Sequence, residues 1–332
     1  MKAKVKYTHE ADFRRERDFG AKIGATFEFV AAQFRPLFKC LAYFVLPGAL
    51  LAGIGMGLFV NNMLAMVPKP GHVVNAPIRI AQNYPSNMFT GTSFVGIGLA
   101  MVGLLVAFLL LSSTVYAFVR VRMATPPDEV VWPAQVWAFV WRRLGRVLGA
   151  WLLLSFVMMV GLGVLGGCLA LLGPGFVVLL FFPLVWVMVC LTLYLPALWM
   201  EDNGALAALR RTFYLVKGKW WSTLGLYMII SFITGIINYV FMIPMYGLMM
   251  VRMMLKIPGF DSDILGVVAT SIYAMGWVFT ASLPLIAMLF QYFNLAERKD
   301  GIGLRLLVDS LGQTAAPQVR NATYRADEEG EY

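Results

Sequence analysis

The chain has 332 residues, of which 60% are hydrophobic and 14% are charged, and its mean hydropathy is +0.73. Soluble domains usually carry about a quarter charged residues, so a globule this apolar could not cover its own surface and lipid must be its solvent. The formal net charge of +9 would suit nucleic-acid binding, but the bases lie between long apolar stretches, which argues against that class. Cys40, Cys168 and Cys190 are too few and too far apart for a disulfide framework or a metal site.

The first 40 residues carry charges throughout and lack the apolar core of a signal peptide, so residues 1–40 are expected to stay in the cytoplasm. Apolar side chains nevertheless recur there at the spacing of one face of a helix. The stripe consists of Phe19, Ile23, Phe27, Val30, Phe34 and Leu37, with Lys22, Glu28, Gln33 and Arg35 off the stripe. The pattern predicts an amphipathic helix in the membrane interface before the first span.

Five long stretches contain no Asp, Glu, Lys or Arg, and a transmembrane helix needs about 20 apolar residues. These stretches are 40–68, 80–119, 147–200, 220–251 and 264–296. The third is long enough for two helices, with Gly173-Pro174-Gly175 as the break. We therefore predict an all-α polytopic membrane protein whose membrane domain, residues 41–292, contains six transmembrane helices. We place them at 41–62, 93–119, 147–171, 176–200, 221–247 and 265–292.

The basic residues decide the orientation of these spans. Of the 27 Lys and Arg residues, 23 lie before the first span, after the last, or in the loops 120–146 and 201–219, and four lie in the remaining loops. Cytoplasmic loops are rich in Lys and Arg, so both termini are predicted to be cytoplasmic. The cytoplasmic tail, residues 293–332, becomes polar and acidic from about residue 312, a composition typical of disorder.

Two more amphipathic stretches precede the third and fifth spans, which makes three cytoplasmic interfacial helices in all. Their stripes are Trp132, Val136, Val140, Leu144 and Val147, and Leu206, Leu209, Phe213, Val216 and Trp220. With Phe29, Phe139 and Phe213 set in register, a base follows six or seven residues later in each stretch. This predicts a pseudo-threefold repeat of interfacial helix plus transmembrane hairpin, although any polytopic protein can have basic, aromatic-flanked inner loops.

Three segments carry a family resemblance. Glu201-Asp202, followed by Ala208-Leu-Arg-Arg-Thr-Phe-Tyr-Leu-Val-Lys-Gly-Lys-Trp-Trp221, resembles a group of bacterial six-helix proteins that includes the YciC-like proteins and the membrane domain of glycerophosphodiester phosphodiesterases. Arg17-Asp-Phe-Gly-Ala-Lys-Ile-Gly-Ala-Thr-Phe-Glu-Phe29 and the segment from Gln291 to Gly301 look like uncharacterised Bacteroidetes members of that group. The resemblance implies a six-helix fold in a bacterial inner membrane. It transfers no activity, because the phosphodiesterase chemistry belongs to a separate soluble domain that this sequence does not contain.

No catalytic or cofactor site can be assembled from the sequence. Gly161-Leu-Gly-Val-Leu-Gly166 matches the dinucleotide-binding pattern, but it lies inside a span with no preceding strand. Close helix packing explains it better, as it does Gly53-Ile-Gly-Met-Gly57. The two histidines, His9 and His72, lie outside the predicted spans, and no Ser–His–Asp set or zinc-hydrolase motif is present. We therefore expect no enzyme, no cofactor and no resident metal.

Methionines crowd the outer end of the fifth span. They are Met242, Met245, Met249, Met250, Met253 and Met254, with Met63, Met66 and His72 on the same side. Thioethers suit Cu(I), although methionine is more often a flexible filler of apolar gaps. The alternative hypothesis is therefore a transporter or channel for a lipidic, neutral or metal (copper) substrate, which would require a cleft among the spans.

The cytoplasmic bases are the strongest functional signal. Eight of them follow or flank an aromatic stripe, and we call this set the basic collar: Arg35, Arg142, Arg143, Arg146, Arg210, Arg211, Lys217 and Lys219. Each well-placed base would gain about 1 kcal/mol from an anionic leaflet, although the same bases could serve only to set topology. We predict a non-enzymatic inner-membrane protein, a scaffold or accessory factor, whose collar engages anionic phospholipid or a membrane-protein partner.

Overall fold

The computed structural model describes residues 7–8, 10–65, 91–126, 128–173, 177–252, 262–301 and 308. Every secondary-structure element within these residues is a helix. The helices are α1 (Glu10–Phe13), α2 (Phe19–Ala32), α3 (Phe34–Phe44), α4 (Leu46–Ala65), α6 (Gly91–Ala124), α7 (Pro133–Leu172), α8 (Val177–Leu191), α9 (Tyr194–Met200), α10 (Ala205–Val216), α11 (Trp220–Met250), α12 (Asp263–Thr280) and α13 (Ser282–Asp300). Six helical segments in this part of the chain are long and apolar enough to cross a membrane, which confirms the predicted all-α class with six candidate spans.

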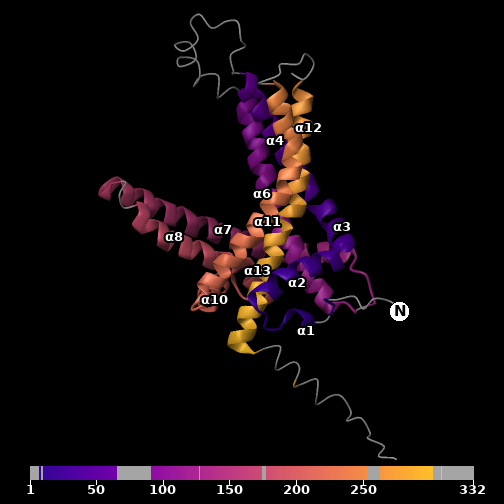
Figure 1. Cartoon of the computed structure of the whole chain (residues 1–332), viewed down its shortest axis with the longest axis vertical. Coiled ribbons are helices and arrows are strands. Elements are labelled where there is room, and N and C mark those ends of the chain that lie inside the picture. Colours follow the sequence, from indigo (N-terminus) through magenta and orange to yellow (C-terminus); the bar gives the residue numbers. More distant parts are fainter. Residues whose placement is uncertain are drawn as a thin grey trace, which may run out of the picture.

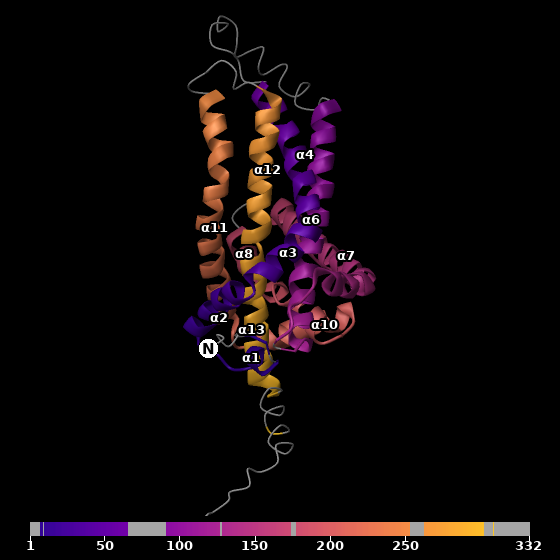
Figure 2. The same ribbon diagram turned by 90° about the vertical axis from the view of Figure 1, so that its right-hand side faces the viewer.

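Four of these helices form a column along the long axis of the molecule. α6, α4, α12 and α11 lie side by side in that order, with α4 in contact with both α6 and α12 (Figure 1, Figure 2). α7 and α8 form a hairpin that projects sideways from the lower half of the column (Figure 1). α2, α10 and the second half of α13 lie at the lower end, below the long apolar part of the column (Figure 2).

Glycines let α4 approach both of its neighbours. A Cβ atom built on Gly55 would lie 2.3 Å from the backbone nitrogen of Ala100 in α6. On the other face of α4, a Cβ atom on Gly53 would lie 2.9 Å from the Cα atom of Ser271 in α12. A backbone atom cannot yield to a methyl group at such distances, so only glycine fits. The predicted packing role of the glycines from Gly53 to Gly57 is confirmed.

The same prediction is wrong for the glycines of α7. No atom of the described residues lies within 4 Å of a Cβ atom built on Gly161, Gly163 or Gly166, apart from the local backbone of the helix itself. The reason is that this part of α7 belongs to the projecting hairpin, which has few neighbours. Leu152 and Phe156, on the same helix, are 72% and 59% exposed. In a bilayer, lipid would cover such side chains.

Prolines account for three interruptions of the helices. The breaks at Gln33, Leu193 and Ala281 separate α2 from α3, α8 from α9, and α12 from α13. Each break is followed three residues later by a proline: Pro36, Pro196 and Pro284. Proline has no N–H to donate to the preceding turn and its ring crowds that turn, so the helix is disrupted there. α7 has Pro133 only at its first position, so the expected interfacial helix and the third span form one continuous helix.

The N-terminal segment packs into a core at the lower end of the molecule. Phe13 stacks on Phe290 of α13 with ring centroids 6.1 Å apart, and the edges of Tyr7 and Phe29 contact the same ring. The guanidinium of Arg17 lies 5.0 Å from the centroid of Phe290. α1 and α2 are therefore fixed against α13, and Tyr7 and Gly301 lie at the same end of the column, as an even number of spans requires.

Lys22 lies on the face of α2 that packs against the protein. The residue is only 2% exposed, and its Nζ atom donates to Gln291 Oε1 at 2.8 Å and to Ser222 Oγ at 3.2 Å. Gln291 in turn donates from Nε2 to Thr223 Oγ1 at 2.8 Å. In the predicted apolar stripe, Ile23, Phe27 and Val30 of α2 are half-buried and also pack against the core. On α3, Leu37 of the stripe is buried and Phe34 is 55% exposed. The protein core thus covers the side of α2 that carries Lys22.

Candidate functional site

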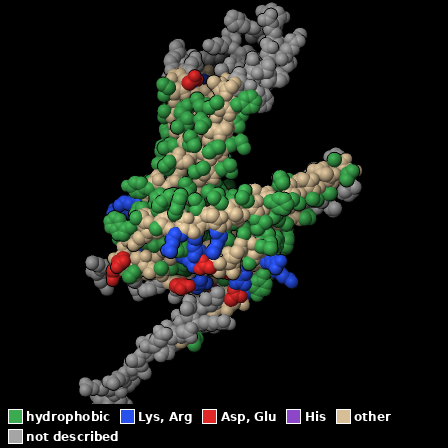
Figure 3. Space-filling view, turned by 180° about the vertical axis from the view of Figure 1, so that it is seen from behind, with side chains coloured by type: hydrophobic (Ala, Val, Ile, Leu, Met, Phe, Trp, Pro, Cys, Tyr) green, Lys and Arg blue, Asp and Glu red, His purple; other side chains and the backbone are tan. Residues whose placement is uncertain are grey.

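Charged side chains gather at the lower end of the molecule. In Figure 3, Lys and Arg form a band below the column and below the projecting hairpin, and a few acidic side chains lie among them. The column and the hairpin above this band show mainly hydrophobic side chains (Figure 3). Ions are costly in hydrocarbon, so this boundary is where a headgroup region is expected.

Asp202 joins three arginines at the root of the hairpin. It lies between α9 and α10 in a left-handed backbone conformation with φ of 55°. Arg120, near the end of α6, donates from Nη1 to Asp202 Oδ1 at 3.0 Å and from Nη2 to Oδ2. Arg143 on α7 forms an ion pair with Oδ1, and Nη1 of Arg146 lies 3.7 Å from the same oxygen. One carboxylate therefore ties α7 to α6 and to the start of α10.

This Asp202 cluster has more positive charge and more donors than acceptors. Three guanidinium groups share one carboxylate, and each has five N–H donors. Nη1 of Arg143 is buried without an acceptor among the described residues, as is Nε1 of Trp199, whose ring centroid is 5.9 Å from that guanidinium. Phe139 packs 4.6 Å from the guanidinium of Arg143 and 5.7 Å from that of Arg120. Burial alone would raise the pKa of Asp202, but hydrogen bonds from the arginines outweigh it and lower that pKa.

Glu201 builds a second cluster whose positive charge is fully compensated. Nε of Arg211 donates to Glu201 Oε1 at 2.7 Å, and Nη2 of Arg211 pairs with Asp300. The hydroxyl of Tyr292 donates to the same Glu201 oxygen at 2.7 Å. Burial would lower the pKa of Arg211, but its two carboxylate partners outweigh this effect and raise the pKa. This cluster connects α10 to α13 and leaves Arg211 committed to internal partners.

The structure divides the predicted basic collar into two groups. Five side chains are exposed and form no hydrogen bond or ion pair with the other residues that the structure describes: Arg35, Arg142, Arg210, Lys217 and Lys219. The other three, Arg143, Arg146 and Arg211, are held by acidic side chains. The exposed group can meet an external anion without breaking any described contact, whereas the second group is already part of the fold.

Three residues of the Asp202 cluster are absent from the predicted set. Arg120 is the first base after the charge-free stretch 80–119, which places it at the interface, but nothing in the sequence indicates its partner. Asp202 is 82 positions away from it in the chain. Trp199 lies at the end of a predicted span, where an aromatic residue is unremarkable. Only the fold brings these side chains together.

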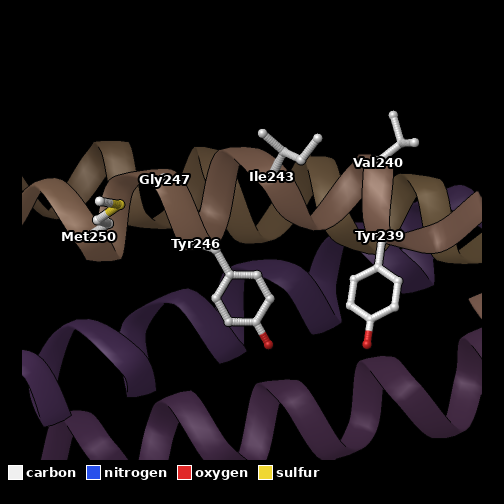
Figure 4. A pocket seen from close by; sticks show the side chains of 6 residues that line it. All are labelled: Tyr239, Val240, Ile243, Tyr246, Gly247 and Met250. Carbon is white, nitrogen blue, oxygen red and sulfur yellow. The ribbon is translucent and has the colours of Figure 1, made fainter. Parts of the chain in front are cut away.

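A shallow hollow on α11 is the feature that bears on the carrier hypothesis. Its volume is about 400 Å³, and it is lined by Tyr239, Val240, Ile243, Tyr246, Gly247 and Met250 (Figure 4). The rings of Tyr239 and Tyr246 point to one side of the helix, and Val240 and Ile243 point to the other (Figure 4). All lining residues come from one helix and none is charged. The hollow is a shallow depression in a surface that would face lipid. As a candidate binding site it is therefore less specific than the Asp202 cluster.

Four of the nine residues behind the metal hypothesis lie outside the described part of the chain: Met66, His72, Met253 and Met254. Within the described ranges, no group of three or more His, Cys, Asp or Glu side chains is arranged so that it could hold a metal ion.

Comparisons with protein-family models, curated proteins and solved structures find no match. The resemblance to YciC-like proteins therefore stays a prediction, and the function has to be argued from the geometry of the charged end.

Proposed function

We propose that this chain is a non-enzymatic integral protein of a bacterial inner membrane that holds anionic phospholipid headgroups at its charged end, acting as a scaffold or accessory factor. The observation that carries the proposal is the exposed group of the basic collar. These five bases are exposed and have no acidic partner among the described residues. Figure 3 shows a band of Lys and Arg side chains directly below the apolar column. A headgroup phosphate is the anion that a base at this depth would meet.

Exposed tryptophans support this depth. Trp141, which precedes Arg142, is 64% exposed, and Trp221, two residues after Lys219, is 78% exposed. Tryptophan is enriched where the hydrocarbon meets the headgroups. A base at that level gains about 1 kcal/mol from an anionic leaflet, and salt weakens the attraction over a Debye length of about 8–10 Å. Headgroup binding by the collar should therefore be salt-dependent.

The test replaces Arg142, Arg210, Lys217 and Lys219 with glutamine. This removes four exposed charges without breaking a described ion pair, and it leaves 19 of the 23 inner bases to set topology. We expect less anionic phospholipid to co-purify with the variant than with the wild type. The amount of bound lipid should also fall less when the salt concentration is raised. Lipid extraction and mass spectrometry measure both effects. The control exchanges Arg for Lys and Lys for Arg at the same four positions, which keeps the charge. If the glutamine variant retains wild-type lipid with wild-type salt dependence, the collar is only a topology signal.

A further inference from the structure

The Asp202 cluster differs from the exposed group of the collar because its charge is concentrated and its geometry is fixed. Three positive charges from α6 and α7 face one negative charge, which leaves an excess of two. Arg211, by contrast, forms ion pairs with two carboxylates, those of Glu201 and Asp300. Phe139 and the buried Trp199 pack against the guanidinium of Arg143 and hold it in place.

We propose that Arg120, Arg143 and Arg146 form a binding site for a terminal phosphate dianion, either a phosphomonoester in a lipid headgroup or free phosphate. The inference rests on the proposed function, because it specifies which anion the charged end prefers. A phosphomonoester carries a charge of about −1.5 to −2 at neutral pH, which matches the excess charge of the cluster. The phosphodiester of a common anionic phospholipid carries about one charge, and planar guanidinium groups match phosphate oxygens in pairs.

The cluster is open on the side where a phosphate would enter. The side chains of Asp202 and Arg146 are 47% and 43% exposed, whereas those of Arg120 and Arg143 are 25% and 19% exposed. The contact of Arg146 with Asp202 is also the longest of the three, at 3.7 Å. A phosphate would therefore bind Arg146 first and then share the two inner arginines with Asp202.

Titration of the purified full-length protein with two lipids tests this site. Phosphatidic acid presents a phosphomonoester and phosphatidylglycerol a phosphodiester, and binding of each is followed by native mass spectrometry. We expect the wild type to prefer phosphatidic acid about tenfold, and Arg146→Gln to reduce that preference about fivefold. Arg15→Gln is the control, because it removes the same charge from an exposed side chain that belongs to neither the basic collar nor the Asp202 cluster, and it should keep the preference.

The pH dependence of the preference for phosphatidic acid provides a second readout. A merely structural role of Arg146 would not change it. The second pKa of a phosphomonoester is about 6, so the preference should fall between about pH 7.5 and 5, while the arginines stay charged. The lowered pKa of Asp202 keeps its carboxylate ionised over this range. Displacement of phosphatidic acid by inorganic phosphate would assign the site to free phosphate, and retention of the lipid would assign it to the headgroup.

Two results would overturn the site. They are equal affinity of the wild type for both lipids, and a preference that is the same in Arg146→Gln as in the wild type. Neither result affects general headgroup binding by the collar, which the four-residue glutamine variant tests separately.

Discussion

Replacing Lys22 with methionine should remove a pH dependence of stability that the wild-type protein shows in mild alkali. The ammonium group of Lys22 is buried, and its two hydrogen-bond partners, Gln291 and Ser222, are uncharged. Burial first, and then the positive charge of Arg298, lower the pKa of Lys22 from 10.5 to about 8. Asp18 opposes this shift without cancelling it. The folded protein therefore loses this proton at a lower pH than the unfolded chain does.

The size of the effect follows from the two pKa values. The unfolded state binds more protons than the folded state between about pH 8 and 10.5, so stability rises with pH across this window. With these values, the free energy of unfolding should increase by about 2 kcal/mol between about pH 7.5 and 9.5. Below about pH 7 the lysine is charged in both states, and the penalty for burying its charge is fully present.

Unfolding of both proteins in detergent, followed by tryptophan fluorescence at a series of pH values, measures this difference. Subtracting the curve of Lys22→Met removes contributions from other groups, such as Tyr7, whose pKa is raised by burial and by Glu28. We expect the wild type to gain stability relative to the variant as the pH rises. Parallel curves for the two proteins would refute the argument, because they would mean that Lys22 has the same proton affinity in the folded and unfolded states.

Two further predictions compare neighbouring positions by thermal unfolding in detergent. Gly103→Ala should lower the free energy of unfolding by about 2–3 kcal/mol, because its Cβ atom would lie 2.3 Å from the backbone nitrogen of Ala52. At Gly98 an added Cβ atom meets no atom within 4 Å, so Gly98→Ala should be neutral or slightly stabilising. Equal melting temperatures would contradict the close packing of α4 on α6. Arg211→Gln should cost about 2–3 kcal/mol, because two largely buried carboxylates lose their cation, whereas Arg210→Gln should change stability by less than about 0.5 kcal/mol. Similar losses at both positions would show that the Glu201 cluster contributes little.

The number of apolar spans could be predicted because charge cannot be placed cheaply in hydrocarbon. The predicted spans 93–119 and 221–247 lie within α6 and α11, and the helices continue for a few residues beyond them. The interruptions could not be placed as easily, since proline breaks some membrane helices and is tolerated in others. Pro284 follows a break, whereas Pro183 and Pro244 lie within continuous helices.

The direction in which the hairpin of α7 and α8 projects cannot be predicted from hydropathy. Apolarity predicts that a helix is long enough to cross a bilayer, but its tilt and its neighbours depend on packing. The glycines of α4 and α7 look alike in the sequence, yet only those of α4 contact other helices closely. Their difference comes from partners supplied by distant parts of the chain, such as Ala100 and Ser271.

The candidate site could be predicted only in part, because its contacts also depend on partners from distant parts of the chain. The excess of bases in alternate loops and at the two ends of the chain is visible in the sequence. Which of these bases are free is not visible, since Arg210 and Arg211 are adjacent and only the second meets acidic side chains. In the sequence, Glu201 lies between two spans and Asp300 follows the last one, and both look like ordinary solvated residues. Ion pairs between residues that are tens of positions apart in the chain can be identified only from the fold.

The position of the Asp202 cluster agrees with span boundaries that the sequence defines independently. The charge-free stretch of α6 ends at Arg120, and that of α7 begins immediately after Arg146. These two residues are unrelated in the sequence, yet both contact the carboxylate of Asp202. Two helices therefore reach the limit of their apolar stretches at one point in space, although the hairpin leaves the column in a different direction. A carboxylate that gathers arginines at this limit lies where hydrocarbon gives way to headgroups, and a phosphate is the anion most abundant at that depth.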